Sequence, residues 1–421
     1  MQETTPGVYS SEPFFSPCAA SKTRVARFLA AVLVAGTSLS ASAFDMAADG
    51  VGKDSIDWGL IMDMSGPSAA AQVPWVYGFQ DYMRRVNEAG GINGRKINVI
   101  AEDDRYDAAL HRIAYEKLSG QTPVLGMSGL GNSSAQTALM PMIRRGKVPV
   151  VGTYTATKAG VDPVSPMFYA GFCGYKEMAQ VGVGHFATTL KKAPKIAVVH
   201  LDVASGKEYF DFIEAAALSQ GGTAKSLPIK VTAIDATPQV LEIIAQKPDV
   251  VALHGAPTTA ILVMRTMAQY GLNIPTFAGT YQGSPVVYSA IGPEAGKNYY
   301  FMSCLTPGGG DEGGAIREMS ATADKYGHSA EKLDVNYVGG WVVAQTVAES
   351  IARVGAEPTR AKLVESMNKG FDVDTKGISA PLRYTPADHT GRMAIRPYKY
   401  DYAAKRFVAF GTYADSQKFM K

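Results

Sequence analysis

Residues 55–102 decide the fold and read SIDWGLIMDMSGPSAAAQVPWVYGFQDYMRRVNEAGGINGRKINVIAE. The apolar-rich runs at 55–64 and 96–102 predict β-strands, and residues 74–89 between them have the spacing of an amphipathic helix. Gly90-Gly91 should end that helix, because glycine adopts a positive φ at little cost. A strand, a helix and a second strand in this order predict a βαβ unit with parallel strands.

The same alternation continues along the chain and predicts an α/β fold with parallel sheets covered on both faces. Further strands are expected at 123–127, 148–152, 195–200, 224–231, 250–254 and 276–278, and further helices at 107–119, 133–145, 208–220, 238–246 and 258–270. Two α/β sets of similar layout, joined near 168–194, indicate two lobes. The last third predicts helices at 337–354 and 359–368 and antiparallel strands within 382–411, while the glycine-rich segment 307–314 is expected to be a surface connection.

Length and composition narrow the class of protein. The chain has 421 residues, 46% of them apolar, which is enough for two domains or more. Its 41 basic and 38 acidic residues leave a formal net charge of +3, so it has no strong positive field and nucleic acid is not an expected partner. Three cysteines in so long a chain exclude a disulfide scaffold and a multi-thiolate metal site.

The N-terminal region predicts export. Lys22, Arg24 and Arg27 precede an apolar run at 28–39, and Ala41-Ser42-Ala43 follows with the small residues of a cleavage site. The twelve residues of that run are too short to cross roughly 30 Å of hydrocarbon, so a signal peptide is expected and not an anchor. Residues 1–43 are therefore assigned to an extension and a signal peptide cleaved near Ala43, and a periplasmic location follows.

No motif supports catalysis. Residues 126–130, GMSGL, lack the second glycine of a nucleophile elbow, and residues 129–134, GLGNSS, lack the third glycine of a dinucleotide fingerprint. The histidines do not occur at the spacing that metal ligands show, so a zinc site is not expected. The acid run 102–104 has no further ligands beside it, and it is interpreted as a solvated strand end and not a cation site. We expect no enzyme activity, no cofactor and no metal. The six histidines are His111, His185, His200, His254, His328 and His389.

Polar side chains follow the predicted strands in both sets. Because ligands of open parallel sheets bind beyond the carboxyl ends of the strands, these clusters are the candidate binding residues. Each hydroxyl taken alone also fits helix capping or turn chemistry. Ser133 and Ser134 also begin a helix, where free N–H groups favour a carboxylate. The clusters are Ser65-Gly66, Asn132-Ser133-Ser134, Thr153-Tyr154-Thr155, 202–207 with Asp202 and Ser205, His254-Gly255 and Tyr281-Gln282.

The same regions resemble the type I periplasmic solute-binding proteins of the branched-chain amino-acid ABC transporter family, the proteins similar to the leucine/isoleucine/valine-binding protein. The segment 87–97, NEAGGINGRKI, carries most of the resemblance, with 64–67, MSGP, 102–104, EDD, 247–251, KPDVV, and 270–272, YGL, as weaker matches. The resemblance covers about 56–413. It implies two Rossmann-like lobes hinged by three crossovers, with the ligand enclosed between them.

Binding residues carry over from the family by position. The serine that holds the ligand's carboxylate falls on Asn132 or Ser133. The backbone donor and hydroxyl after the next strand fall on Tyr154 and Thr155, with Thr157 as an alternative. The aromatic residue of the first loop falls near Trp75 or Tyr77, and a second-lobe tyrosine falls on Ser205.

One departure from the family concerns the cargo. Family members that bind amino acids place an acid after the last strand of the second lobe, and Tyr281 stands there in this chain, followed by Gln282. An unpaired buried ammonium is costly, so an ordinary α-amino acid is disfavoured unless Asp202 substitutes. Tyr281, Tyr154, Trp75 and Phe172 instead suit a flat apolar or aromatic acid.

The resemblance also suggests the boundaries of the lobes. Lobe 1 is expected to comprise 44–170 and about 303–370, and lobe 2 about 171–302 and 371–421. The family's usual first-lobe disulfide is missing, but Cys173 and Cys304 fall near predicted crossovers. A hinge disulfide between them in the oxidising periplasm is one hypothesis, and two separate buried thiols are the other.

The family suggests a role in import. We expect a monomeric receptor that captures a small carboxylate-bearing solute and delivers it to an ABC permease in the inner membrane. The alternatives are a periplasmic sensor of the same fold that acts on a signalling partner, and a binder of a branched-chain amino acid or a short amide. The sequence does not identify the solute.

Overall fold

The computed structural model describes residues 46–155, 157–308, 313–391, 394–410 and 414–415. All of them belong to one unit, Phe44–Lys421. The predicted signal peptide, the expected mature start near Phe44 and residues 309–312 of the glycine-rich connection lie outside this described part. Within it, no helix is both long enough and apolar enough to span a bilayer.

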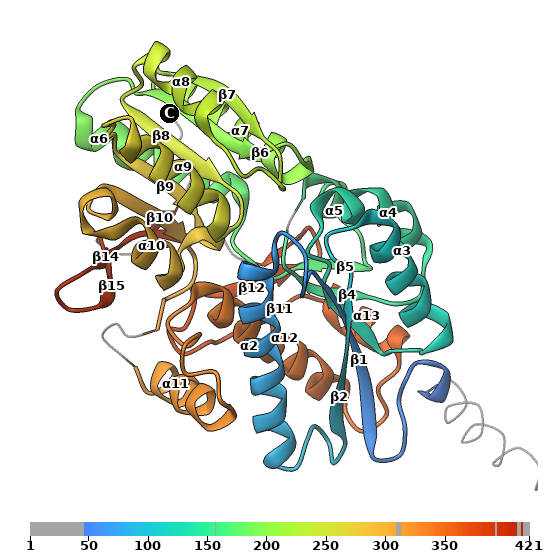
Figure 1. The fold of residues 1–421 in the computed structure, drawn as a ribbon. Coiled ribbons are helices and arrows are strands. Elements are labelled where there is room, and N and C mark those ends of the chain that lie inside the picture. The colour runs from blue at the N-terminus through green and yellow to red at the C-terminus, as the bar shows by residue number, and fades with distance from the viewer. Residues whose placement is uncertain (1–45, 156, 309–312, 392–393, 411–413, 416–421) are drawn as a thin grey trace, which may run out of the picture. The chain divides into compact units, whose positions relative to one another are not determined.

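Lobe 1 is built on a five-stranded parallel sheet of order β2-β1-β3-β4-β5 (Figure 1). The central strand β1 is buried over nearly its whole length, as expected where helices cover both faces. Its parallel register places Trp58 beside Gly126, and the Trp58 Nε1 donates to Ser128 Oγ at 2.9 Å. The strands are β1 (Ser55–Met62), β2 (Lys96–Asp103), β3 (Gly126–Gly129), β4 (Val150–Thr153) and β5 (Phe168–Ala170).

Two layers of helices cover this sheet. In Figure 1, α2 and α12 lie on one side and α3, α4 and α5 on the other. The lobe 1 helices are α2 (Ala69–Glu88), α3 (Ala108–Glu116), a π-helical turn η1 (Lys117–Gln121), α4 (Ser133–Arg145), α5 (Lys158–Val161), α11 (Gly314–Tyr326), α12 (Val335–Val354) and α13 (Arg360–Asn368).

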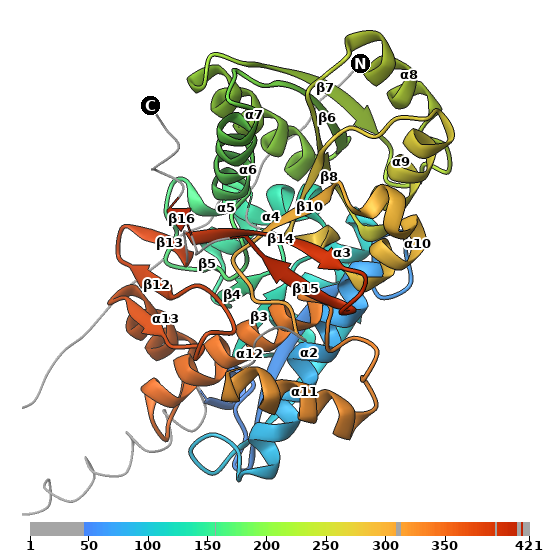
Figure 2. The same ribbon diagram turned by 90° about the vertical axis from the view of Figure 1, so that its left-hand side faces the viewer.

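Lobe 2 is built on an eight-stranded sheet whose parallel part, β7-β6-β8-β9-β10, has the same strand order as the lobe 1 sheet. Strands β14 and β15 extend it in antiparallel fashion beyond β10, as Figure 2 shows. The predicted fold, two α/β lobes of like topology, is confirmed. Its elements are α6 (Tyr175–Leu190), β6 (Lys195–Leu201), α7 (Ala204–Ser219), β7 (Thr223–Ile229), α8 (Thr237–Gln246), β8 (Val250–His254), α9 (Pro257–Gln269), β9 (Thr276–Gly279), a 3₁₀ turn η2 (Thr280–Gln282), α10 (Pro285–Gly296), β10 (Tyr299–Ser303), β14 (Ala394–Asp401), β15 (Arg406–Ala409) and β16 (Ala414–Asp415).

A third sheet comprises β11 (Phe371–Val373), β12 (Leu382–Thr385) and β13 (Asp388–Gly391). The sequence-based boundary placed 371–421 in lobe 2, but β13 contacts β5 and β11 contacts α12, so this small sheet packs on lobe 1. Two long-range hydrogen bonds hold it there: the Tyr384 hydroxyl donates to the Ala170 carbonyl, and His389 Nδ1 lies 2.9 Å from the Ser165 carbonyl oxygen. The chain thus changes lobe after β5, after β10 and between β13 and β14.

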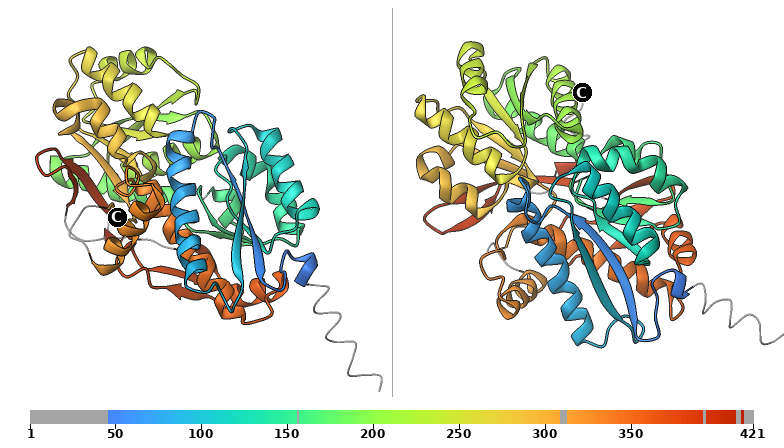
Figure 3. Two further views of the ribbon diagram at one scale, coloured as in Figure 1. Left: turned by 60° about the horizontal axis from the view of Figure 1, so that its bottom comes forward. Right: turned by 45° about the vertical axis from the view of Figure 1, so that its right-hand side comes forward.

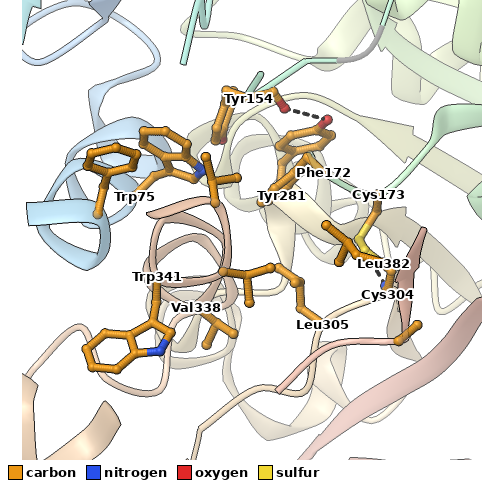
Figure 4. Close-up of a cluster of buried hydrophobic side chains, with 14 of the residues drawn as sticks. Trp75, Tyr154, Phe172, Cys173, Tyr281, Cys304, Leu305, Val338, Trp341 and Leu382 are labelled. Atoms are coloured by element: carbon orange, nitrogen blue, oxygen red, sulfur yellow. Dashed lines mark hydrogen bonds between the residues drawn. A yellow bond between two sulfur atoms is a disulfide. The ribbon is translucent and has the colours of Figure 1, made fainter. Parts of the chain in front are cut away.

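Cys173 and Cys304 form a disulfide, with their Cα atoms 5.4 Å apart. Cys173 follows β5 and Cys304 follows β10, so the bond joins two of the three crossovers (Figure 4). Of the two hypotheses drawn from the sequence, the hinge disulfide is the one that the structure has.

Several helices differ from their predicted extents, and α10 and α11 were not predicted, but the differences at α2 and α6 matter most for the site. Helix α2 begins at Ala69, five residues before the Pro74 that was expected to start it, and Pro74 lies inside the helix. Helix α6 occupies a segment that was expected to be a connection between lobes. Buried residues occur on nearly all of its faces, so α6 has no polar stripe and its sequence lacks the amphipathic period that marks a surface helix.

Helices α2 and α12 pack with their backbones in contact through two glycines, and Figure 3 shows the blue α2 beside the orange α12. A Cβ added at Gly78 would lie 2.0 Å from the Tyr337 carbonyl oxygen, and one at Gly340 would lie 1.9 Å from the Trp75 carbonyl oxygen. This approach sets the position of Trp75 and, through it, of the lobe 1 wall described below.

Candidate ligand-binding site

The candidate site is a cavity between the lobes, where the carboxyl ends of strands from both parallel sheets meet, as the switch-point rule for open α/β sheets requires. The cavity volume is about 30 Å³. Small-molecule sites typically have about 300–1,000 Å³, so the lining side chains nearly fill the space in this arrangement, and a solute requires the lobes to move apart. Five of the predicted residues line it: Tyr154, Thr155, Ser205, His254 and Tyr281.

Three other predicted residues take part in lobe 1 packing and not in the lining. The Ser65 hydroxyl is exposed and donates to Asp103 Oδ2 at 2.6 Å. Trp75 is fully buried behind Tyr154, with ring centroids 6.3 Å apart. Asn132 caps α4, accepting from Ala135 N–H and donating to the Tyr106 carbonyl. Their roles in the structure are those of turn and core residues.

Two further predicted residues, Asp202 and Gln282, do not line the cavity. Asp202 is exposed and forms an ion pair with Lys207 at 3.1 Å. Gln282 is fully buried but does not line the cavity. Of the two alternatives, Tyr77 stacks on His328 with centroids 4.0 Å apart, and Thr157 Oγ1 donates to Gln136 Oε1 at 2.9 Å.

Two helix N-termini meet across the lobes beside the cavity, and of the four residues joined there only Ser205 lines it, so the predicted Ser133 and Ser134 lie outside the lining. Ser133 and Ser134 are the first residues of α4, and their hydroxyls accept from the backbone N–H groups of Ser205 at 3.3 Å and Ala204 at 3.2 Å. Those two residues belong to the first turn of α7, whose N-cap Val203 offers no side-chain cap. Each helix end carries a partial positive charge of about half an elementary charge, so an anion at their junction would be stabilised by both.

Aromatic rings form a second wall, drawn in Figure 4. The Tyr281 ring centroid lies 5.0 Å from those of Tyr154 and Phe172 and 5.7 Å from that of Tyr175. The Tyr281 hydroxyl donates to the Tyr154 carbonyl at 3.0 Å, which fixes a lobe 2 ring against lobe 1. Tyr281 thus packs on rings of the protein itself in this closed arrangement, and its role as a stacking surface for a solute stays a prediction.

The acid run at the end of β2 organises the loops around the cavity. Asp103 accepts from Met64 N–H, Asp104 accepts from Tyr106 N–H, and Asp63 after β1 accepts from Ser68 N–H. Oxygens of the three carboxylates lie within 4.8 Å of one another. Because these oxygens accept from protein donors, the arrangement favours a structural role over a cation site.

Sequence reasoning missed three polar residues of the lining: Ser68, Tyr106 and Tyr175. Tyr106 depends on a positive φ of 60°, held by Asp104. Tyr175 begins α6, the helix that was not predicted. Ser68 lies three residues beyond Ser65 in the same loop. The turn that Asp63 holds places Ser68 in the lining, and the sequence does not show which of the two serines faces the cavity. Glycine or apolar residues complete the lining: Gly131, Leu201, Gly255 and Ala256.

A buried hydrogen-bond network connects the hinge to the two tyrosines. Asp334 at the start of α12 accepts from the Ser284 hydroxyl of lobe 2 at 2.6 Å and from Asn336 N–H at 2.8 Å. Asn336 in turn accepts from the Tyr154 hydroxyl and donates to the Tyr281 carbonyl, each at 3.1 Å. Burial raises the pKa of Asp334 from 3.8 to about 6, although the bonds from Ser284 and Asn336 oppose the rise.

An Asp334→Asn variant should be less sensitive to pH than the wild type. Between pH 3.8 and about 6 only the folded chain keeps the Asp334 proton, so this group's contribution to stability falls as pH rises and is fully lost above pH 6. The loss amounts to roughly 3 kcal/mol. Urea denaturation of both proteins from pH 4 to pH 7 measures it. Stability curves that stay parallel over this range would contradict the expectation.

Comparison with known proteins places this geometry in a family. The periplasmic binding protein family matches residues 55–405. An amino acid binding protein of Pseudomonas aeruginosa is 24% identical over 310 residues, covering 72% of this chain and 81% of that protein.

Two solved structures share the fold. A branched-chain amino acid ABC transporter protein of Thermus thermophilus with bound valine has a TM-score of 0.79 at 19% identity, covering 88% of this chain and 98% of that one. A fatty acid ABC transporter substrate-binding protein of Thermomonospora curvata has a TM-score of 0.76 at 21% identity, covering 88% and 96%. The match of the family to most of the chain, together with the two-lobed fold, shows that the chain belongs to the periplasmic binding protein family.

Proposed function

We propose that this chain is the periplasmic substrate-binding component of an ABC importer and that it captures a small carboxylate-bearing solute between its lobes. The solute is an aromatic or another non-standard acid. The periplasmic location rests on the family and on the predicted signal peptide. The partners are the solute and an ABC permease of the inner membrane, and no nucleic acid or cofactor is involved.

The proposal that the solute has a carboxylate rests on the junction of the α4 and α7 N-termini. Ser133 and Ser134 on one helix and Ala204 and Ser205 on the other bring two positive helix ends together. The described residues that line the neighbouring cavity include no acidic side chain. Two like-signed helix ends repel each other, and a bound anion turns that repulsion into attraction for both lobes. Carboxylate binding would thereby favour the closed arrangement.

A branched-chain amino acid is the second candidate, favoured by two similar proteins, an amino acid binding protein and a protein with bound valine. Valine and a fatty acid both have a carboxylate. The two solved structures therefore support an anionic group on the solute but do not indicate the rest of its structure. The position expected to hold an ammonium-binding acid has Tyr281, and Asp202 is engaged by Lys207. These two facts favour an acid that lacks an ammonium group.

Release of the solute would require the lobes to separate. In the closed arrangement the Tyr281–Tyr154, Ser205–Ser133 and Ala204–Ser134 hydrogen bonds span the cavity. A hinge motion about the three crossovers breaks them together, and ligand shifts the equilibrium by its differential affinity for the closed form. A permease that binds the closed form would detect the solute in this way.

Thermal-shift measurements test the proposal. The purified protein should melt at a higher temperature with aromatic and aliphatic carboxylates than with the corresponding amides, because a ligand that binds only the folded state stabilises it by mass action. At a concentration about 100 times Kd the gain is about 2.7 kcal/mol. Strong stabilisation by leucine or valine without any by acids that lack an ammonium group would establish the second candidate instead.

A further inference from the structure

The cavity offers no charged partner to a solute cation. The described residues that line it include no Asp, Glu, Lys or Arg. Two buried carboxylates that hydrogen bonds connect to lining residues, directly or through Asn336, have other partners: Asp63 accepts from Gly66 and Ser68 N–H, and Asp334 accepts from Ser284 and Asn336. A solute ammonium would therefore be buried unpaired, at a cost of several kcal/mol.

Two buried polar side chains in the lining nevertheless lack a hydrogen-bond partner. Thr155 Oγ1 of lobe 1 and His254 Nδ1 of lobe 2 have none among the described residues, and both residues are only 5% exposed. Buried polar atoms without partners are rare in folded proteins, and in a binding cavity they mark the places where a ligand completes the hydrogen bonding.

The two side chains serve different ends of the cavity. Thr155 lies beside α4, whose Gln136 Nε2 donates to the Thr155 carbonyl at 3.0 Å, so it belongs to the carboxylate end. His254 ends β8 on the lobe 2 side, with its ring centroid 5.4 Å from that of Tyr175 and 5.5 Å from that of Tyr209.

His254 is an uncharged group at physiological pH. Burial, together with the smaller effect of neighbouring His200, lowers its pKa to about 3. A neutral imidazole has one N–H donor and one nitrogen acceptor, so it suits a hydroxyl or a carbonyl group and not a second anion.

The body of the solute must lie against an aromatic wall. Tyr154, Tyr175 and Tyr281 line the cavity and pack on one another, with the Tyr154 and Tyr175 centroids 5.0 and 5.7 Å from that of Tyr281, so a solute ring does not fit between them. Once the lobes move apart, such a wall favours stacking by a flat ring over contact with a branched aliphatic chain.

We propose that the solute is an aromatic carboxylic acid that bears an uncharged hydroxyl or carbonyl group, and that His254 selects it by a hydrogen bond to that group. The inference rests on the proposed function, because the carboxylate is held at the α4–α7 junction. It assigns to His254 a specificity-determining role and to Thr155 a contact with the carboxylate.

Isothermal titration with benzoate, its three monohydroxylated isomers and L-tyrosine tests the proposal. At least one hydroxybenzoate should bind about tenfold or more tightly than benzoate, because its hydroxyl gives the buried imidazole a partner. L-tyrosine should bind more weakly than that isomer. The proposal is overturned if benzoate binds as tightly as all three isomers, or if only aliphatic acids bind. Either result would still be consistent with a carboxylate site. If benzoate and benzamide bind alike, the proposed function itself fails.

Three variants locate the effect. His254→Leu should bring the ratio of hydroxybenzoate to benzoate affinity to within about threefold, and His254→Asn, which keeps a hydrogen-bonding side chain, should retain part of it. His185→Leu is the matched control, because His185 lies in the same lobe and packs against Phe186 and Tyr300 outside the cavity. If the ratio of affinities is unchanged in both His254 variants, this residue does not contact the solute. If the leucine variant does not fold, the ratio measured with the asparagine variant tests the proposal alone.

Discussion

The Ser205→Asp variant should bind carboxylate solutes at least about 100-fold more weakly than the wild-type protein. Ser205 lines the cavity in the first turn of α7, and its N–H lies 3.3 Å from the Ser133 hydroxyl of lobe 1. An aspartate there places a negative charge where the solute carboxylate is expected. Two like charges about 4 Å apart repel by about 4 kcal/mol at the effective dielectric constant of a protein surface, and a 100-fold loss needs only about 2.7 kcal/mol.

Ser205→Asn is the control for this effect, because its side chain has the size of aspartate without the charge. Titration of both variants with the same carboxylate separates charge from volume, and melting temperatures confirm that each variant is folded. Ser205 is only 3% exposed, so the positive end of α7 has to offset the cost of burying the aspartate. Equal affinity of the two variants would show that the anion does not bind beside α7.

Gly340→Val should destabilise the protein by about 4 kcal/mol or more. Even the first carbon of a side chain at this position would lie 1.9 Å from the Trp75 carbonyl oxygen, so α2 and α12 would have to separate along their contact. Overpacking of a core typically costs about 1–3 kcal/mol, and a clash with backbone that cannot rotate away belongs to the upper end or beyond.

Urea denaturation measures this loss, with Gly314→Ala as the control. Gly314 begins α11, and a Cβ there would meet nothing within 4 Å. Alanine at such a position is expected to be neutral or slightly stabilising, by up to about 1 kcal/mol. Similar denaturation midpoints for Gly340→Val and the wild type would mean that the helices are not packed as closely as described.

Many of the strands and helices could be predicted because the spacing of apolar residues in the sequence indicates which faces are buried. The apolar run at Val250–His254 and the capped helix at Ser133–Arg145 have the predicted bounds. Two of the failures have the same cause, which is packing between distant parts of the chain. Helix α6 is buried on nearly all sides, and residues 371–391 join lobe 1 through Tyr384 and His389, contacts that depend on distant parts of the chain.

The candidate site was predictable in place but only partly in its side chains. Strand ends can be read from the sequence, so Tyr154, Ser205, His254 and Tyr281 were found. The direction of a loop side chain depends on remote partners instead. Asp103 holds Ser65 away from the cavity, which leaves the position to Ser68.

The most direct test of the central claim is an isothermal titration at pH 7 that compares a carboxylate with the amide of the same skeleton. We expect the carboxylate to bind at least about 100-fold more tightly, because only the anion gains from the facing N-termini of α4 and α7. Equal affinities, or tighter binding of the amide, would contradict an anion site between the lobes.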